Sequence, residues 1–530
     1  MKSRIKLYQH QKDAAKKMAK VDKGIICMPT GVGKTYSQAA IIAKDITEHK
    51  NQFRMYVVNA PRIILTYQLM NDIYDFITRE GIEALYMFVH SGGLTDERDI
   101  NIIREDAKER GIRYSDINAG TSIAGVQDTM RRARDLNLPV VFFSTYNSAD
   151  RIEEARIGLT EQKLSIVLND EAHYLVRADF NHIITTLKSD RCYFFTATMI
   201  NSTSEEGRGM NVEKLYGEVL YTMLPSTAID KGFMVCPRLH FVTTADVVND
   251  ADYEKSINKV ILSTFHQHEE VLRIDHNGKT RPKVLVSVRG VQDIINFVGL
   301  NDDSRSDEYL KLRSEGVEIY AVASSDAIHN NINGSTNFTR QEFLRKMRID
   351  GTNKDKKMLV LHYDILAEGI SISGFSGIMP LRTLSKSKFL QTFGRSARPD
   401  SDDKIQIKRI LKSRGKDGIL SREDWNKMNK PYAYIMIPNL YVGNHDDSKY
   451  IEDLVNELRS FNYDPTEIIV TDDDIRGEGK FSIPDPGIGP RNSTIRHFSM
   501  IIEDMEKWRI AIDESKRSKM DLLRKKYNKK

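Results

Sequence analysis

The segment with the clearest chemical capacity is Met-Pro-Thr-Gly-Val-Gly-Lys-Thr at residues 28–35. Its two glycines allow the backbone to turn N–H groups toward an anion, and the lysine that follows can reach the β- and γ-phosphates of a nucleotide. Met28 replaces the first glycine of the strict pattern, but the apolar run Gly24–Cys27 before it and the helix formers after it suit such a loop. We therefore expect a phosphate-binding loop whose nucleotide contacts come from Pro29, Thr30, Gly31, Val32, Gly33, Lys34 and Thr35.

Two carboxylates stand at the end of a second apolar run. The stretch Lys163–Asn169 predicts a buried strand, and Asp170-Glu171-Ala172-His173 follows it directly. Asp170 can hold Mg²⁺ together with the hydroxyl of Thr35, and Glu171 can orient and deprotonate an attacking water. This pair of segments predicts phosphoryl chemistry.

Hydrolysis of a phosphoanhydride also needs positive charge where the transition state becomes negative. Gln391-Thr-Phe-Gly-Arg-Ser-Ala-Arg398 offers two arginines, Arg395 and Arg398, at a spacing that places both on one face of a helix. Gly394 permits a close approach to a neighbouring segment. If this part of the chain faces the phosphate loop, the arginines complete a nucleotide site whose floor lies in the first domain.

The elements that must position these residues follow a βα alternation, which is typical of a mainly parallel sheet covered by helices. In the first part of the chain the expected strands are Gly24–Met28, Met55–Asn59, Ala84–His90, Val140–Ser144, Ile166–Asn169 and Cys192–Thr196. Pro225, Gly232 and Pro237 then punctuate the chain, and the alternation restarts. The strands expected there are Val284–Val288, Glu318–Val322, Met358–His362, Gly377–Pro380 and Tyr434–Pro438.

We therefore predict an α/β protein with domains at residues 1–230 and 231–442 and a small, mainly helical C-terminal extension with a basic tail at 443–530. A charged, helix-prone insertion at about 96–137 is expected to be a solvated surface excursion. The Lys-rich stretch Ser401–Lys430 is expected to be irregular. Asp472–Asp474 invites a nuclease interpretation, but an acidic loop accounts for it better.

Bulk properties limit the classes of protein. A chain of 530 residues is long enough for about three domains, and 40% hydrophobic with 29% charged residues is typical of a globular protein. The sequence has no run of about 18 apolar residues, so no membrane span is predicted. The basic N-terminus lacks an apolar signal core. Three scattered cysteines indicate a reducing, cytosol-like compartment. The net charge of +5 permits a polyanionic partner without requiring one.

The ordered set of motifs resembles superfamily 2 helicases and translocases of the DEAH type over roughly residues 5–440. Besides the three segments above, the matching positions are Gln11, Asn59–Arg62 with Gln68, Ser144–Tyr146, Thr196–Thr198, Val284–Val288 and Glu368–Ile370. Glu-Gly-Ile followed by Gln-x-x-Gly-Arg-x-x-Arg-Pro is similar to type III restriction motor subunits and bacteriophage DNA helicases. The sequence departs from the family pattern at His10, Met199 and Ser371.

The resemblance implies two RecA-like domains that close on ATP and Mg²⁺. Gln11 would read the adenine, and Gly369 would contact the nucleotide beside Arg395 and Arg398. The residues implied to couple closure to a nucleic-acid groove are His173, Thr196, Thr198 and Gln391. Those implied to contact nucleic acid, mainly at its backbone, are Arg62, Thr145 and Ser287. The expected partner is DNA, single-stranded or branched, with no membrane and with protein partners unidentified. The resemblance also implies a cytoplasmic location, in a bacterium or a phage-infected host.

Three functions remain open at this point. The first is an ATP-dependent DNA helicase or translocase, for example in phage-type replication, recombination or repair. The second is the motor subunit of a restriction or defence complex with its nuclease on another chain, or an RNA helicase. The third, a nucleic-acid scaffold with a degenerate nucleotide site, is disfavoured because Lys34, Asp170, Glu171, Arg395 and Arg398 are all present.

Overall fold

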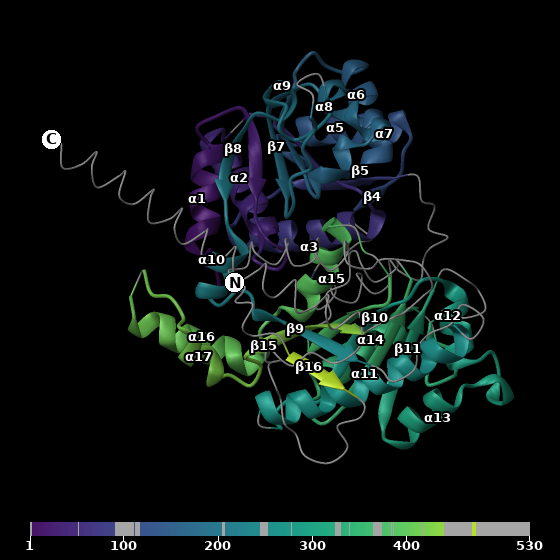
Figure 1. The fold of residues 1–530 in the computed structure, drawn as a ribbon. Coiled ribbons are helices and arrows are strands. Elements are labelled where there is room, and N and C mark those ends of the chain that lie inside the picture. Colours follow the sequence, from purple (N-terminus) through teal and green to yellow (C-terminus); the bar gives the residue numbers. More distant parts are fainter. Residues whose placement is uncertain are drawn as a thin grey trace.

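The computed structural model describes residues 3–50, 52–90, 111, 117–203, 207–243, 253–276, 278–323, 330–338, 340–363, 374–382, 384, 386–415, 417–438 and 469–472. These residues form two lobes, each built on one sheet with helices packed around it (Figure 1). The first lobe comes from the N-terminal part of the chain and the second from the part that follows, so the lobes are consecutive in sequence.

The first sheet has the strand order β4-β3-β5-β2-β6-β7-β1-β8, and its strand pairs are all parallel. Its strands are β1 (Lys23–Cys27), β2 (Met55–Ala60), β3 (Leu85–Val89), β4 (Asn118–Ala119), β5 (Val140–Thr145), β6 (Leu164–Asn169), β7 (Ser189–Thr196) and β8 (Glu218–Thr222). The helices are α1 (Gln9–Met18), α2 (Lys34–Glu48), α3 (Ile63–Arg79), α5 (Ile123–Asp135), α6 (Asp150–Ile157), α7 (Ala178–Asn181), α8 (Ile183–Thr186) and α9 (Glu213–Tyr216). β2, β5 and β6 are buried along their whole length, as expected for strands covered on both faces.

The second sheet has the order β12-β11-β13-β10-β14-β15-β9-β16, and only β11 with β12 is antiparallel among its described pairs. Its strands are β9 (Cys236–Thr243), β10 (Lys283–Ser287), β11 (Val317–Val322), β12 (Asn331–Ile332), β13 (Lys357–His362), β14 (Gly377–Pro380), β15 (Tyr432–Pro438) and β16 (Ile469–Asp472). The helices are α11 (Tyr253–Asp275), α12 (Val291–Val298), α13 (Asp307–Ser314), α14 (Arg340–Thr352), α15 (Lys386–Ser396), α16 (Ser401–Ser413) and α17 (Arg422–Asn426).

The predicted fold class, two tandem parallel-sheet domains, is confirmed, and every strand expected from the sequence is present. The sequence patterns did not indicate β4, β8, β9, β12 or β16. Two of these have only two residues, and β9 carries Pro237, a residue depleted in strands. The local sequence gives little signal for such strands, because they form only through pairing with neighbouring strands.

Two expectations about irregular or solvated segments are wrong. The end of the charged insertion is not a solvated excursion, because α5 buries Val126, Met130 and Ala133 in the core of the first domain. These residues recur at helical spacing, so one apolar face packs inward while the charged face stays outside. Residues 96–110 and 112–116 of the insertion lie outside the described residues. The Lys-rich stretch from Ser401 is also not irregular, since it forms α16 and α17.

Of the segment expected to be an acidic loop, residues 472–474, only Asp472 is among the described residues. Ile469–Asp472 is strand β16, which pairs in parallel with β9 at the edge of the second sheet. The rest of the predicted C-terminal extension, with its helices and basic tail, lies outside the described residues. The domain boundaries drawn from the sequence remain predictions.

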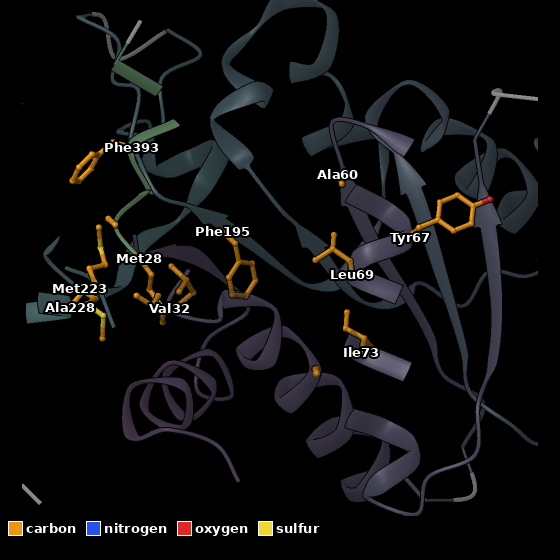
Figure 2. Close-up of a cluster of buried hydrophobic side chains, with 14 of the residues drawn as sticks. Met28, Val32, Ala60, Tyr67, Leu69, Ile73, Phe195, Met223, Ala228 and Phe393 are labelled. Carbon is orange, nitrogen blue, oxygen red and sulfur yellow. The ribbon is translucent and has the colours of Figure 1, made fainter. Parts of the chain in front are cut away.

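The two domains share one hydrophobic cluster. Phe389, Phe393 and Ala397, in and just after α15, belong to the same cluster as Met28 and Val32 of the phosphate loop. Figure 1 shows α15 between the two lobes, and Figure 2 shows Phe393 on the same side of the cluster as Met28, Val32 and Met223. The surface between the domains is therefore packed, and α15 is the element that carries the second domain onto the first.

A short helix, α10 (Pro225–Asp230), makes the covalent crossing from β8 to β9. The backbone N–H of Met223, just before it, donates to the carbonyl of Cys27 in β1 at 2.9 Å. At its other end the carbonyl of Asp230 accepts from the N–H of Leu420 at 2.7 Å. The crossing is thus bonded to one domain where it begins and to the other where it ends. Among the described helices, none is long and apolar enough to cross a membrane.

Candidate functional site

The phosphate loop joins β1 to α2. Gly31 and Gly33 have φ of 86° and 83°, in the left-handed region that favours glycine. Lys34 is the first residue of α2, so the loop ends at a helix N-terminus, where free backbone N–H groups favour an anion. The Lys34 side chain is buried, and its Nζ donates to the carbonyl of Met28 at 3.3 Å. Pro29 and Val32 are buried as well, whereas Thr35 is half-buried in the first turn of α2.

The first helix of the chain packs directly on this loop. Gln11 Nε2 donates to the carbonyls of Val32 (3.3 Å) and Gly33 (3.1 Å), while its Oε1 accepts from the N–H of Tyr8 at 2.9 Å. His10 Nε2 lies 2.9 Å from the same Val32 carbonyl, and burial lowers the pKa of His10, which favours the neutral ring. The glutamine expected to read adenine therefore lies beside the phosphate loop.

The acidic strand end lies on the opposite wall of this site. Asp170 follows β6, and its Oδ1 accepts a hydrogen bond of 2.8 Å from Nε2 of Gln38, a buried residue of α2. Its backbone carbonyl accepts from the hydroxyl of Tyr146 at 2.7 Å. Burial, and then the charge of Glu171, raise the pKa of Asp170, whereas Lys34 opposes the shift. The carboxylate therefore lies within the electrostatic reach of Lys34, in a position that favours an added cation.

Sequence reasoning missed Gln38, although a signal was present. Gln38 lies four residues after Lys34, so both side chains project from one face of α2. A polar residue one turn along the helix after a phosphate-loop lysine can thus be expected to face the same site. In this protein it holds the carboxylate predicted to bind Mg²⁺.

Glu171 has an unusual backbone conformation for a residue with a side chain, with φ of 49° and ψ of 48°. Residues held in such sparsely populated regions cluster at functional sites. His173 Nδ1 lies 3.4 Å from Glu171 Oε2 and 3.3 Å from the hydroxyl of Thr196. The Thr196 hydroxyl in turn donates to the carbonyl of Thr198 at 2.7 Å. Three of the predicted coupling residues therefore form one chain that starts at the predicted general base.

The second domain reaches the phosphate loop through α15 and the turn after it. Arg395 lies in α15, but Arg398 lies two residues after the helix ends, so the two arginines do not share one helix face as predicted. A Cβ added to Gly394 would lie 2.0 Å from the Thr30 hydroxyl, so α15 touches the loop with no room for a methyl group. A Cβ added to Gly31 would lie 3.6 Å from Nε of Arg398. Arg395 is buried, and burial lowers the pKa of Arg398. Gly369 lies outside the described residues, and of Gln391 only the backbone, within α15, is described.

The segment that joins the domains contacts both halves of this site. The Phe233 ring makes edge contacts with Tyr8 and His10, at centroid distances of 4.9 and 4.8 Å. Two residues later, the N–H of Val235 donates to the carbonyl of Ala397 at 2.7 Å. The joining segment thus touches the helix that holds the phosphate loop and the turn that follows α15.

The three predicted nucleic-acid contacts differ in exposure. Arg62, at the start of α3, is exposed. Thr145 is buried and its hydroxyl donates to Ser148 Oγ at 3.3 Å. Ser287 is 1% exposed, and its hydroxyl lies 2.9 Å from His362 Nε2. Of the three, Arg62 is therefore the residue whose side chain lies at the surface.

A group that sequence reasoning missed lies at the carboxyl ends of three adjacent strands of the second sheet. Tyr363 follows β13, Arg289 closely follows β10 and Arg382 closely follows β14. The Arg382 guanidinium lies 4.8 Å from the centre of the Tyr363 ring, and Arg289, which is exposed, donates from Nε to the carbonyl of Leu381 at 3.3 Å. The signal for this group is an arginine soon after an apolar strand, in Val286-Ser-Val-Arg289 and Met379-Pro-Leu-Arg382.

Comparison with known proteins agrees with this architecture. Residues 4–201 match the family model described as type III restriction enzyme, res subunit. The solved structure of the ATP-dependent Type ISP restriction-modification enzyme LlaBIII bound to DNA matches with a TM-score of 0.58 at 17% identity, covering 89% of this chain and 31% of that one. Comparison with curated proteins gives no match.

Two further solved structures match with lower scores. A nuclease-deletion mutant of the Type ISP enzyme LlaGI, in complex with a DNA substrate mimic, has a TM-score of 0.49 at 17% identity and covers 86% of this chain and 29% of that one. Dbp5 of S. cerevisiae bound to RNA and ADP BeF3 has a TM-score of 0.47 at 14% identity, with 88% and 90% covered.

The chain spans about a third of the length of the restriction enzymes with which it is compared, 31% and 29%. At 17% identity, the match to LlaBIII is a likeness of fold. The resemblance drawn from the motifs is confirmed: residues 4–201 match the res-subunit family model, and the two-domain fold of the chain is similar to that of the Type ISP enzyme LlaBIII.

Proposed function

We propose that this protein hydrolyses ATP between its two domains and uses the resulting opening and closing to move along or remodel DNA. The observation that carries the proposal is the contact of α15 and the turn after it with the phosphate loop, where Gly394 of the helix meets Thr30 and Arg398 of the turn lies beside Gly31. A site whose cations come from one domain and whose phosphate loop comes from another is complete only when the domains close. Hydrolysis is then coupled to domain movement, because the site is complete only in the closed arrangement.

Each side chain has a role in this proposal that follows from its position. Lys34 and the loop N–H groups bind the β- and γ-phosphates, and Arg395 and Arg398 stabilise the charge that develops during transfer. Glu171 orients the attacking water and accepts its proton. The series of contacts from His173 through Thr196 to Thr198 couples the position of Glu171 to the rest of the first domain.

Mg²⁺ fits the oxygen donors that the site offers. Asp170 and the Thr35 hydroxyl would hold it, since oxygen ligands are the kind it prefers. Burial, and then the charge of Glu171, raise the pKa of Asp170, and a cation bound there would favour the charged carboxylate. When bound, Mg²⁺ supplies charge neutralisation for the phosphates.

The choice of DNA rests on the subgroup motifs and on the comparisons. The res-subunit family match and a Type ISP restriction enzyme bound to DNA support it. We propose that Arg62 of the first domain, with Arg289 and Arg382 of the second, contacts the sugar-phosphate backbone, which carries no base information. Replacing Arg289 and Arg382 together with alanine should then weaken binding uniformly across DNA sequences and reduce the salt dependence of the affinity by about two in the log–log slope.

A panel of nucleic acids tests the function. The ATPase rate of the purified protein is measured alone and with single-stranded DNA, duplex DNA, branched DNA and RNA. Stimulation by DNA supports the proposal, stimulation by RNA alone overturns the DNA assignment, and stimulation by neither favours a scaffold. Glu171→Gln serves as the matched inactive variant, which should still bind ATP but not turn it over, and turnover near the wild-type rate would remove Glu171 from the role of base.

The res-subunit match favours a second candidate, the motor subunit of a restriction or defence complex whose nuclease is on another chain. The DNA-stimulated ATPase would be the same in both cases. The two candidates differ in their protein partners. In the second case, a tagged protein purified from its native cell would co-purify with a nuclease chain. Purification as a single active chain supports the free-standing motor.

A further inference from the structure

The end of α15, which carries Arg395, and the turn after it, which carries Arg398, are held by a buried lysine. Lys430, 1% exposed, donates from Nζ to the carbonyl of Ser396 at 2.6 Å and to that of Arg398 at 2.9 Å. The last carbonyls of a helix have no partner within the helix, and a cation there is favoured by the helix dipole. Lys430 therefore caps the end of α15 just after Arg395 and also binds the backbone of Arg398 in the turn that follows.

Other groups complete this hold. The carbonyl between the two that Lys430 binds, that of Ala397, accepts from the N–H of Val235 in the joining segment at 2.7 Å. The carboxylate of Asp403, on α16, accepts from the N–H groups of Asn429 at 2.8 Å and Lys430 at 3.0 Å. Three consecutive carbonyls, from Ser396 to Arg398, are thus bonded to groups outside α15, and Lys430 is itself fixed by Asp403.

We propose that Lys430 is a positioning residue for Arg395 and Arg398, and that its buried ammonium group sets the geometry in which the two arginines meet the phosphate loop. This inference rests on the proposed function, because it assumes that the arginines act on ATP. Among the described residues, the hydrogen bonds of Lys430 go to Ser396, Arg398 and Asp403, none of which belongs to the phosphate loop. Loss of Lys430 should therefore lower kcat and leave ATP affinity nearly unchanged.

The charge of Lys430 gives a second readout. Burial lowers the pKa of Lys430 to about 8, with Asp400 and Asp403 opposing the shift and Lys283 and Lys404 adding to it. A further titratable neighbour, His276 after α11, has its own pKa lowered by burial and by Lys430, and it stays neutral at pH 7 and above. As pH rises through about 8, the ammonium loses its charge and its hold on the two carbonyls weakens.

The experiment compares Lys430→Met and Lys430→Arg with Lys412→Met, which removes an exposed lysine of α16 and serves as the control. DNA-stimulated kcat, KM for ATP and the affinity for a fluorescent ATP analogue are measured from pH 6.5 to 9.5. We expect Lys430→Met to lower kcat by about tenfold to a hundredfold, since small misplacements of catalytic groups have effects of this size. KM should change less than twofold, and Lys412→Met should match the wild type.

Lys430→Arg keeps the charge at every pH in this range. It should retain kcat near pH 7 within a few-fold and lose the decline that the wild type shows between pH 7 and 9. A wild-type kcat in Lys430→Met, or equal losses of kcat and ATP affinity, would overturn the inference. If Lys430→Met does not fold, the pH profile of Lys430→Arg decides, and an unchanged alkaline decline refutes it. A wild type that hydrolyses no ATP on any nucleic acid refutes the proposed function, and this inference with it.

Discussion

Adding one methyl group at Gly394 should slow the motor while leaving its second domain as stable as before. An alanine Cβ at this position would lie 2.0 Å from the Thr30 hydroxyl and 3.2 Å from the Thr30 Cβ. The first distance is far below van der Waals contact, and Thr30 is β-branched, so its rotamers are restricted. The closed arrangement must therefore give way, either at Thr30 or at the whole interface.

Two free energies of opposite sign follow from this geometry. Overpacking of a tight contact typically costs about 1–3 kcal/mol, and here the cost falls on the closed state alone. Within α15, alanine is favoured over glycine by about 0.5–1 kcal/mol, which stabilises the helix in both the open and the closed state. If hydrolysis occurs only in the closed state, kcat should fall by about fivefold to 150-fold.

The assay pairs DNA-stimulated kcat with the thermal unfolding midpoint of Gly394→Ala. We expect kcat to fall and the midpoint to hold or rise. In the double variant with Thr30→Ala, which removes the hydroxyl at 2.0 Å and leaves the Cβ at 3.2 Å, part of the kcat should return relative to Thr30→Ala alone. Wild-type kcat in Gly394→Ala would mean that the contact between α15 and the loop is not the active arrangement. A fall in kcat with an equal loss of thermal stability would point to misfolding instead.

Three further predictions concern the site and the two cores. Gln38→Leu should lower kcat more than ATP-analogue affinity, because the variant loses the 2.8 Å hydrogen bond that fixes Asp170; unchanged kcat would show that the bond is dispensable. His240 and His276 are buried with pKa values lowered from 6.5 to about 3, so they stay neutral when folded but gain a proton when unfolded below pH 6.5. Their contribution to the free energy of unfolding is then fully present above pH 6.5 and is lost as pH falls, by about 2 kcal/mol for each histidine at pH 5. Denaturant titration at pH 7 and pH 5 measures this loss. Asp45→Ala should lower the free energy of unfolding of the first domain by about 3–5 kcal/mol, since its fully buried carboxylate is the shared partner of two arginines; a loss under 1 kcal/mol would contradict this assignment.

Much of the fold follows from local pattern. β6 is buried at every position, and its run of apolar residues predicts a strand wherever it pairs. The same holds for the chemical residues of the loop at 28–35, because glycine spacing and a lysine at a helix start leave little choice of function. Residues of this kind are recognisable from their types and spacing alone.

The remainder depends on tertiary contacts that have no local signature. Lys430 follows a stretch of polar and charged residues, and by its sequence context it is one more surface lysine. Its burial results from the packing of α16 and β15 around the end of α15, elements that are distant in sequence from the loop they serve. Ser287 shows the converse, since a motif position expected to face nucleic acid is hydrogen-bonded to His362 inside the sheet.

The crossing helix α10 has a mechanical consequence. Because Met223 is hydrogen-bonded to the first domain and Asp230 to the second, the six residues of α10 act as a rigid helical linker about 9 Å long rather than a flexible one. At that corner the domains cannot draw apart without breaking one of those bonds. Any opening that preserves both hydrogen bonds must therefore be a rotation of one domain relative to the other about α10. The parts of the interface farthest from α10 then move the farthest.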